Sequence, residues 1–579
     1  MQTTRLNLGG VSLFACFALL MSWDASAATL TVTNTSDSGS GSLRDAVASA
    51  VPGDAINFNL STPATITLGS TLVIGVNLTI SGPGQSNLAI SGDNAIRVLY
   101  INPGVTATIA GLTVRNGRDD PSDPYGGGGI FNAGTLILSS STLSGNAAGT
   151  GGGIANYGTL TVSSSTLSGN SAYNGIFGDG GAISNVGPLT VVNSVISGNS
   201  ANYAGGIINH DVSLTIANST LSGNSAIYDG GAIVQNFGSV TIIDSTLSGN
   251  AASRQGGGIF NYSGALIIKN STLSSNSAPA GGGLYNYGAS TLTNSTLSGN
   301  QATAGGAIYN SYSSLTVINS TIAGNSGNSG GGIYNGYVLT LKNTILANNP
   351  PGGNCFVTYL LTSAGHNISD DDNCFLTGTG DLNSAPAGLD PGGLQDNGGP
   401  TQTIALRVTS PAVDAVSPNY CTLTDGVTPV SADQRGVPRP QVAGCDIGAY
   451  ELTPFSFSAF TAKLDLKGQG FALNAAFTVG AGGSPIDPST QAVRLQIGPY
   501  IVAIPAGSFH QTQGSNPANW SYAGTINGVK LSVQILARDG RYQFNATGSP
   551  VDISGVSNPV DVAIQIGFDA GSTQVTPNI

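Results

Sequence analysis

A repeat of about 25 residues fills the middle of the chain and restricts its fold more than any other feature. The phrase Ser-Thr-Leu-Ser-Gly-Asn, at residues 141–146, recurs so that its closing Asn returns every 23 to 29 residues. A second phrase, Gly-Gly-(Gly/Ala)-Ile-x-Asn, keeps the same period. This periodicity indicates a solenoid of stacked units. The Asn residues of the first phrase are Asn146, Asn170, Asn199, Asn224, Asn250, Asn276, Asn300, Asn325 and Asn348, and those of the second are Asn132, Asn156, Asn185, Asn209, Asn236, Asn261, Asn286, Asn310 and Asn335.

Each repeat unit predicts three short strands separated by turns. In one unit the alternation of apolar and polar residues directs Ile154, Leu160, Val162 and Leu167 inward. The Gly pairs and the lack of helix formers exclude a helical hairpin. Residues 55–350 are therefore expected to form a parallel β-helix. Coils stacked about 4.8 Å apart bring like residues into columns, so the Asn side chains should form internal amide ladders.

The beginning of the chain has the pattern of an export signal. Arg5 precedes an apolar run at residues 11–21, and an Ala-Ser-Ala cleavage site follows at residues 25–27. Residues 1–27 are therefore predicted to be a signal peptide. No other stretch is apolar and long enough for a transmembrane helix. Residues 28–54 should cap the solenoid with a short helix from Ser42 to Val51, in which Ser42 is the N-cap.

Four cysteines remain after the predicted cleavage, and all lie within residues 351–453. Four cysteines allow three pairings, and the pairs that close the shortest loops are Cys355 with Cys374 and Cys421 with Cys445. An exported protein can keep such disulfides. The spacing lacks a C-x-x-C motif, so a zinc site is not expected. We expect this segment to be a disulfide-containing C-terminal cap, because the last coil of a solenoid otherwise exposes a sheet edge.

Residues 454–579 have a different pattern from the repeats. Stretches of alternating apolar and polar residues indicate antiparallel strands, and Asp-Gly at residues 539–540 is a hairpin signal. We predict a β-sandwich of about 120 residues, which is an ordinary domain size. The expected strands lie at residues 463–467, 471–479, 493–497, 531–535, 542–546 and 562–568.

Several motifs resemble known families of exported proteins. The Gly-Gly-(Ala/Gly)-Ile repeats resemble those of chlamydial polymorphic outer-membrane proteins and of the pectin-lyase-like superfamily, which implies a right-handed β-helix. Residues 41–46 resemble a C-S-L-R-E-A opening motif, although Gly41 replaces the Cys and Asp45 the Glu. The segments 396–401, 433–436 and 445–451 resemble the region called choice-of-anchor Q. This resemblance implies a surface or secreted location and no particular reaction.

The charge content excludes some functions and leaves an enzyme as an alternative. Only 8% of residues are charged and the net charge is −12, so no basic surface is expected for nucleic acid. Asp179 and Asp229 occupy equivalent positions before their Gly pairs, with one coil between them, and Arg254 lies near the same turn column. These three residues would suit a weak lyase or glycosidase site, but solvated turn residues are the preferred interpretation. Arg435 and Arg439, near Asp433 and Asp446, are interpreted as a structural ion-pair cluster.

Aromatic residues in the repeats are the strongest binding signal. The Ile of the second phrase points inward, so the next residue points outward, and further aromatics follow the Asn. We predict exposed aromatic ladders that bind sugar rings or extended peptides. The alternative is that the stacked rings only stabilise neighbouring coils. The predicted stripe consists of Phe260, Tyr262, Tyr285, Tyr287, Tyr309, Tyr334 and Tyr337.

The expected function is therefore contact and display. An exported surface or secreted protein would bind a polysaccharide or a surface protein along its rod, without catalysis and without a required cofactor. Asp370, Asp371 and Asp372 are a candidate calcium site, with a plain acidic loop next to Cys374 as the alternative. A polysaccharide lyase or glycoside hydrolase is the second hypothesis, and a structural envelope or matrix protein is the third.

Overall fold

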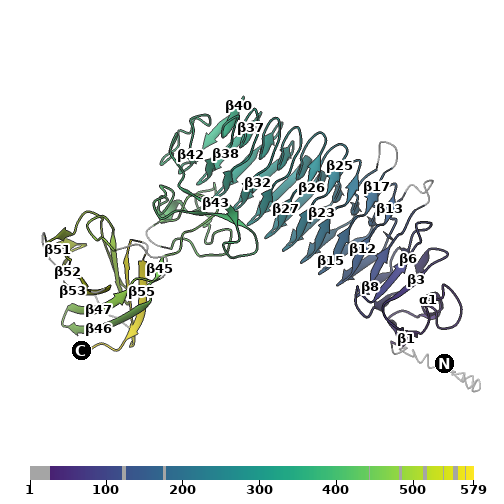
Figure 1. Cartoon of the computed structure of the whole chain (residues 1–579), viewed down its shortest axis with the longest axis horizontal. Coiled ribbons are helices and arrows are strands. Elements are labelled where there is room, and N and C mark those ends of the chain that lie inside the picture. Colours follow the sequence, from purple (N-terminus) through teal and green to yellow (C-terminus); the bar gives the residue numbers. More distant parts are fainter. Residues whose placement is uncertain are drawn as a thin grey trace, which may run out of the picture.

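The computed structural model describes residues 27–119, 125–173, 178–441, 444–480, 486–512, 518–538, 540–551, 558–567 and 569–578. The predicted signal peptide, apart from Ala27, lies outside these residues. The chain forms an elongated parallel β-solenoid, a segment beside its C-terminal coils, and an antiparallel sandwich (Figure 1). The predicted all-β fold class is confirmed. Among the described residues, no helix is long and apolar enough to cross a membrane.

The solenoid is built from three parallel sheets of 24, 13 and 5 strands. The largest sheet contains two columns of strands, and β26 (Ile233–Ile243) and β29 (Ile259–Lys269) run through both. The first column also contains β4 (Leu72–Ile74), β7 (Leu99–Ile101), β10 (Ile130–Asn132), β14 (Ile154–Asn156), β18 (Ile183–Asn185), β22 (Ile207–His210), β31 (Leu284–Asn286), β34 (Ile308–Asn310), β37 (Ile333–Asn335) and β40 (Cys355–Val357). The second also contains β1 (Thr29–Val32), β2 (Ala55–Phe58), β5 (Leu78–Ser81), β8 (Thr106–Ala110), β11 (Thr135–Ser139), β15 (Thr159–Ser163), β19 (Leu189–Val192), β23 (Ser213–Ala217), β32 (Ala289–Thr293), β35 (Leu315–Ile318), β38 (Leu339–Lys342) and β41 (Leu361–Ser363).

The two smaller sheets complete the walls of the solenoid. The 13-stranded sheet consists of β3 (Ala64–Thr67), β6 (Leu88–Ser91), β9 (Thr113–Arg115), β12 (Thr142–Ser144), β16 (Thr166–Ser168), β20 (Val195–Ser197), β24 (Thr220–Ser222), β27 (Thr246–Ser248), β30 (Thr272–Ser274), β33 (Thr296–Ser298), β36 (Thr321–Ala323), β39 (Ile345–Ala347) and β42 (Ile368–Ser369). The 5-stranded sheet consists of β13 (Ala147–Ala148), β17 (Ser171–Ala172), β21 (Ser200–Ala201), β25 (Ser225–Ala226) and β28 (Ala251–Ala252).

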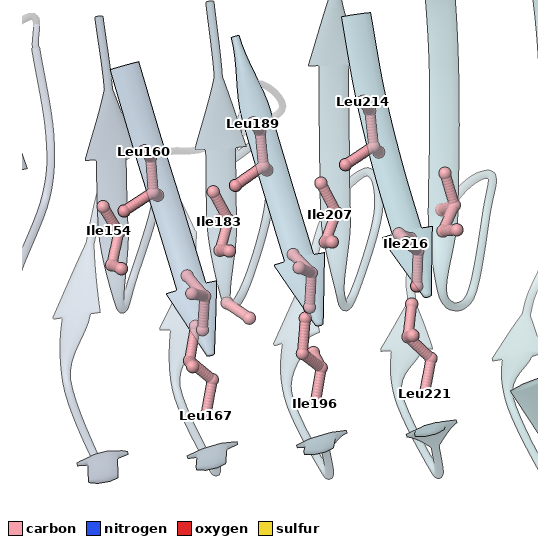
Figure 2. Close-up of a cluster of buried hydrophobic side chains, with 14 of the residues drawn as sticks. Ile154, Leu160, Leu167, Ile183, Leu189, Ile196, Ile207, Leu214, Ile216 and Leu221 are labelled. Atoms are coloured by element: carbon pink, nitrogen blue, oxygen red, sulfur yellow. The ribbon is translucent and has the colours of Figure 1, made fainter. Parts of the chain in front are cut away.

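Aliphatic side chains fill the inside of the solenoid in columns. The four side chains predicted to point inward in one unit, Ile154, Leu160, Val162 and Leu167, are all buried. Figure 2 shows this unit and the next ones, in which the corresponding Leu and Ile residues repeat from coil to coil. The parallel pairing of the strands is in register, so equivalent residues lie directly above one another.

The closing Asn residues of the Ser-Gly-Asn phrase form the predicted amide ladder. The Asn250 amide nitrogen Nδ2 donates to Oδ1 of Asn276 at 2.9 Å and to the carbonyl of Leu221 at 3.0 Å. Its Oδ1 accepts from both the backbone N and Nδ2 of Asn224, each at 3.0 Å. Every donor and acceptor of this buried amide is therefore used, which removes the cost of burying it.

Two positions assigned to the Asn columns were wrong. The last step of the first ladder runs from Asn325 to Asn349, whereas Asn348 adopts a positive φ of 55° in the turn. In the second column Gln235 accepts from Asn209 at 3.0 Å, so Gln235 replaces Asn236. The Gln235 side chain is one methylene longer and donates to the carbonyl of Phe237, at a point where the pairing of β26 with β29 shifts register.

A serine column was missed in the sequence. The backbone N–H of each Ser donates to the Oγ of the Ser in the next coil, as from Ser219 to Ser245 at 3.1 Å. Each Oγ donates to the carbonyl two residues earlier, as from Ser245 to Ile243 at 2.7 Å. The Ser of the repeated phrase thus carries a second ladder beside the amide ladder.

Short segments cover the two ends of the solenoid. Helix α1 (Leu43–Ser49) is shorter than the predicted helix, but Ser42 caps it and accepts from the N–H of Asp45 at 3.1 Å. Leu43, Ala46 and Val47 are buried in the core. At the other end Cys374 and Leu376 join the same core, and Cys374 forms a disulfide with Cys355 in the last coil.

The rest of the Cys-containing segment packs along the flank of the coils. It includes β43 (Leu389–Gln395), β44 (Thr403–Leu406) and the 3₁₀ helix η1 (Pro418–Tyr420). Gln434 bridges the coils, since its Oε1 accepts from Thr296 Oγ1 at 2.6 Å and its Nε2 donates to Thr272 Oγ1 at 2.9 Å. The second disulfide joins Cys421 and Cys445. Both predicted pairings are confirmed.

The C-terminal sandwich contains two sheets around one apolar core, and their strands pair antiparallel except at one edge. One sheet contains β45 (Phe455–Ser456), β48 (Val493–Ile497), β49 (Tyr500–Ile504), β54 (Val560–Ile566) and β55 (Asp569–Val575). The other contains β46 (Ala459–Lys467), β47 (Gly470–Thr478), β50 (His510–Gln511), β51 (Asn519–Ile526), β52 (Val529–Arg538) and β53 (Arg541–Ser549). Arg538 pairs with Arg541, as expected for the hairpin predicted at residues 539–540.

Replacing Asn250 with Ala tests the amide ladder. The variant loses four hydrogen bonds and leaves the buried backbone N–H of Asn224 without its acceptor, so we expect it to be less stable by about 3 kcal/mol. Urea unfolding followed by circular dichroism measures the difference. Ser253→Ala, at an exposed turn position, is the control and should change stability by less than about 0.5 kcal/mol. Equal unfolding midpoints for the two variants would contradict a stabilising ladder.

Candidate binding surface

Two rows of aromatic residues run along one face of the solenoid. Parallel pairing aligns the residues that follow the inward Ile, Leu or Cys of each coil. These residues form the inner row, namely Phe260, Tyr285, Tyr309, Tyr334 and Phe356. The outer row lies just past the Asn column and consists of Tyr262, Tyr287, Tyr312, Tyr337 and Tyr359. The repeat period produces both rows, because it returns each aromatic position to the same place in every coil.

The rings of the inner row cover one another's faces. Tyr285 and Tyr309 have ring centres 4.8 Å apart with planes 5° from parallel, and Tyr309 and Tyr334 are 4.3 Å apart at 3°. Phe260 and Tyr285 are only 9% and 8% exposed. Burial, followed by the neighbouring Tyr334 and Tyr285, raises the pKa of Tyr309 to about 12. The prediction that Phe260 and Tyr285 are exposed was therefore wrong, because both pack in an apolar cluster with Ile208 and Val234.

The outer row remains accessible. Tyr262, Tyr287 and Tyr337 are exposed, as are Tyr312 and Tyr359, which the sequence analysis did not include. Like Tyr337, each of the two lies two residues after the Asn column position. Tyr262 and Tyr287 stack at 5.6 Å and 14°, whereas Tyr287 and Tyr312 are tilted by 47°. A ligand can therefore reach the ring edges and phenol hydroxyls of this row, and it can also reach part of the face of the tilted Tyr312 ring.

Two carboxylates lie in coils that precede the inner row. Asp179 pairs with Tyr203, and the carbonyl of Asp229 in the following coil accepts from Ala204, so both Asp residues belong to one column with Tyr203 between them. Twice the strand spacing puts their backbones roughly 10 Å apart. Arg254 Nε lies 4.0 Å from Asp229 Oδ1.

The surroundings of these carboxylates are less polar than predicted. Burial raises the pKa of Asp179 to about 6. Burial also raises the pKa of Asp229, and Arg254 offsets this only in part. Asp229 is 5% exposed, and its Oδ1 is buried with no hydrogen-bond partner. The preferred interpretation of solvated turn residues was therefore wrong for Asp229.

The predicted calcium site is not assembled. Asp370 accepts from the backbone N of Asn348 at 2.8 Å and from Asn354 Nδ2 at 2.7 Å, and Asp371 accepts from the backbone N of Asn354 at 2.8 Å. Asp372 is exposed in the same turn. Within the part of the chain that the structure describes, no group of three His, Cys, Asp or Glu residues is placed to hold a metal ion. Asp370 and Asp371 instead fix the last turn of the solenoid.

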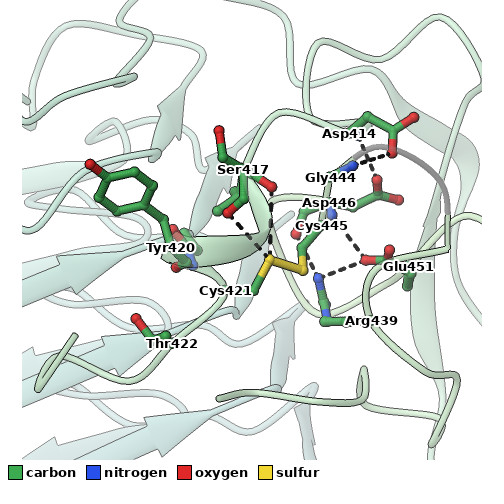
Figure 3. The surroundings of a disulfide bond; sticks show 12 residues. Asp414, Ser417, Tyr420, Cys421, Thr422, Arg439, Gly444, Cys445, Asp446 and Glu451 are labelled. Carbon is green, nitrogen blue, oxygen red and sulfur yellow. Dashed lines mark hydrogen bonds and ion pairs between the residues drawn. A yellow bond between two sulfur atoms is a disulfide. The ribbon is translucent and has the colours of Figure 1, made fainter. Parts of the chain in front are cut away.

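Charged residues next to the second disulfide form a buried structural cluster. Arg439 Nη1 lies 3.0 Å from Glu451 Oε2, and both side chains are buried beside Cys421 and Cys445 (Figure 3). Burial and the neighbouring Glu451 raise the pKa of Asp446 to about 7. Asp446 also accepts from the backbone of Leu452 at 2.6 Å. These contacts hold the flank segment together, as the interpretation of a structural cluster requires.

Comparison with known proteins identifies the winding of the solenoid. Residues 230–376 match a family described as the right handed beta helix region. The matched segment contains the C-terminal coils and both aromatic rows. No curated protein matches the chain. The comparison thus supports the fold and names no ligand or reaction.

The raised pKa of Asp179 predicts a pH effect on stability. Because the folded chain holds this proton more tightly than the unfolded chain, the stabilising contribution is complete below about pH 4 and is lost as the pH rises through about 6. Asp179→Asn removes this loss. The melting temperature of the variant should therefore exceed that of the parent above pH 6, and the difference should vanish near pH 4. Differential scanning calorimetry at several pH values measures it.

Asp211→Asn is the control for this series, because Asp211 is exposed in a turn. Its melting temperature should follow that of the parent at every pH. A constant offset between Asp179→Asn and the parent over the whole range would contradict a carboxyl destabilised by burial.

Proposed function

We propose that the protein is an exported, non-catalytic β-helix protein that binds glycan chains along the outer row. The observation that carries this proposal is the row itself, in which five tyrosines of the last coils remain exposed on a rigid scaffold. Exposed aromatic side chains that form a contiguous surface mark interaction sites. The hydroxyls and ring edges suit a hydroxylated polymer that lies along the row. Each contact is weak, and the regular spacing lets several act together.

Export is part of the same proposal. Residues 1–27 have the pattern of a signal peptide, and the two disulfides are compatible with an oxidising compartment. The repeats resemble those of polymorphic outer-membrane proteins within the pectin-lyase-like superfamily, and the flank segment resembles choice-of-anchor Q. These resemblances support a cell-surface or secreted location and a role in adhesion.

Replacing Tyr262, Tyr287 and Tyr312 together with Ala tests the outer row. A glycan array probed with the parent chain should give bound glycans, and the triple variant should lose at least about tenfold in affinity for them, a change of about 1.4 kcal/mol. Tyr173→Ala, at an exposed tyrosine outside the row, should bind like the parent. No binding by the parent, or equal binding by the triple variant, would refute glycan recognition by the row.

A polysaccharide hydrolase or lyase is the second candidate. Asp179 and Asp229 favour it, because two carboxyl groups with raised pKa values in one column can act as proton donor and acceptor. Burial keeps Asp179 protonated to higher pH than an exposed carboxyl, which suits a general acid. Arg254, beside Asp229, would bind an acidic substrate group.

Assays of reducing ends and of unsaturated uronates on acidic and neutral glycans test this candidate. If it is right, the parent chain releases product and the Asp179→Asn and Asp229→Asn variants each lose at least about a hundredfold in rate. The Asp211→Asn variant should keep full rate. Absence of product on every glycan would rule out the candidate, and a negative glycan array as well would favour a purely structural envelope role.

A further inference from the structure

The sandwich domain carries a groove that the solenoid function does not use. The groove has a volume of about 840 Å³ and lies on the outer face of the sheet formed by β46, β47, β53 and β52. One row of residues crosses its floor, because strand pairing aligns Thr461 with Ala476, Ala476 with Gln543, and Gln543 with Leu536. The short side chains of Thr461 and Ala476 leave this part of the face hollow.

Cations flank the floor of the groove on both sides. Lys463 follows Thr461 on β46 and lies on one side of the row, whereas Arg541 and Arg538 lie on the other side. Arg538 and Arg541 are directly opposite each other on neighbouring strands. The described residues that line the groove include no Asp or Glu.

The basic groove contrasts with the rest of the protein. Residues 454–579 contain six Lys or Arg and six Asp, so the whole net charge of −12 lies in residues 1–453. A polyanion is therefore repelled by the solenoid and attracted to the groove. We propose that this groove binds an acidic polysaccharide, which goes beyond the proposed glycan contact along the outer row.

The geometry favours a polysaccharide over a peptide or a small anion. Strands β47 and β53 are paired on both sides, so their backbone groups are satisfied and cannot bind a peptide by strand addition. A ligand would therefore be bound by side chains. These are the cations that flank the groove, together with Asn474, Gln543 and Thr461. Amides and hydroxyls match sugar hydroxyls, and cations match carboxylates. Strand spacing puts Lys463 and Arg541 roughly 16 Å apart, which requires an oligomer with several charges.

The test uses the full-length chain and the double variant Lys463→Gln/Arg541→Gln. The probe is a hyaluronate oligosaccharide, and its carboxyl-reduced form supplies the same backbone without charge. Titration calorimetry at low salt should show binding of hyaluronate to the parent and at least about tenfold weaker binding to the double variant. Binding should weaken as salt is added, because exposed charges are screened. Lys530→Gln, on the same sheet outside the groove, is the matched control and should stay within about twofold of the parent.

Four results would overturn the proposal. They are no binding of hyaluronate by the parent, equal binding of the carboxyl-reduced form, equal binding by the double variant, and binding of poly-L-glutamate in place of hyaluronate. The triple tyrosine variant of the outer row separates the two sites. It should bind hyaluronate like the parent if the groove is the site, and loss of binding in that variant would assign hyaluronate to the outer row instead.

Discussion

The in-register stacking of one coil on the next is the constraint on which the rest of the structure depends. Each buried Asn amide forms hydrogen bonds to the coils on either side of it. Every coil therefore fixes how its neighbours are rotated about the solenoid axis and where they lie along it. A slip of one residue along a strand would turn inward residues outward and would also break the amide and serine ladders. The ladders thus add specificity to a core that aliphatic residues alone would fill in several ways. Rigid columns on the outside follow directly from this register.

The same stacking decides what the aromatic columns can do. In a column of rings at the coil spacing, each ring packs against the faces of its neighbours. The inner row is therefore held by apolar packing, like the core of the solenoid. Where the position after the Asn column shifts by one residue, as from Tyr287 to Tyr312, the two rings are tilted relative to each other. Recognition by such a surface therefore depends on edges and hydroxyls more than on stacking, and this favours long, hydroxylated ligands over small ones.

The sequence predicted the fold well because the repeat encodes it directly. The period, the inward residues and the amide ladder all follow from spacing, and the disulfide pairs follow from loop length. The side-chain environments were harder to predict. The burial of Phe260 and of Asp229 depends on contacts between neighbouring coils, which no single repeat unit contains. The sandwich groove also required strand pairing, since Lys463 and Arg541 are 78 residues apart and only the register places them on one face.

The flank segment has a consequence for the mechanics of the rod. Among the described residues, its hydrogen bonds to the solenoid reach coils between Asn270 and Asn343, where it acts as a splint across several turns. Elsewhere in a solenoid, the stability of each coil depends only on contacts with the coils next to it. Under a pulling force or protease attack, the N-terminal turns will peel away one after another, whereas the splinted turns will yield as a block. The tyrosine columns lie on this splinted half, so the contact surface would outlast damage to the free end of the rod.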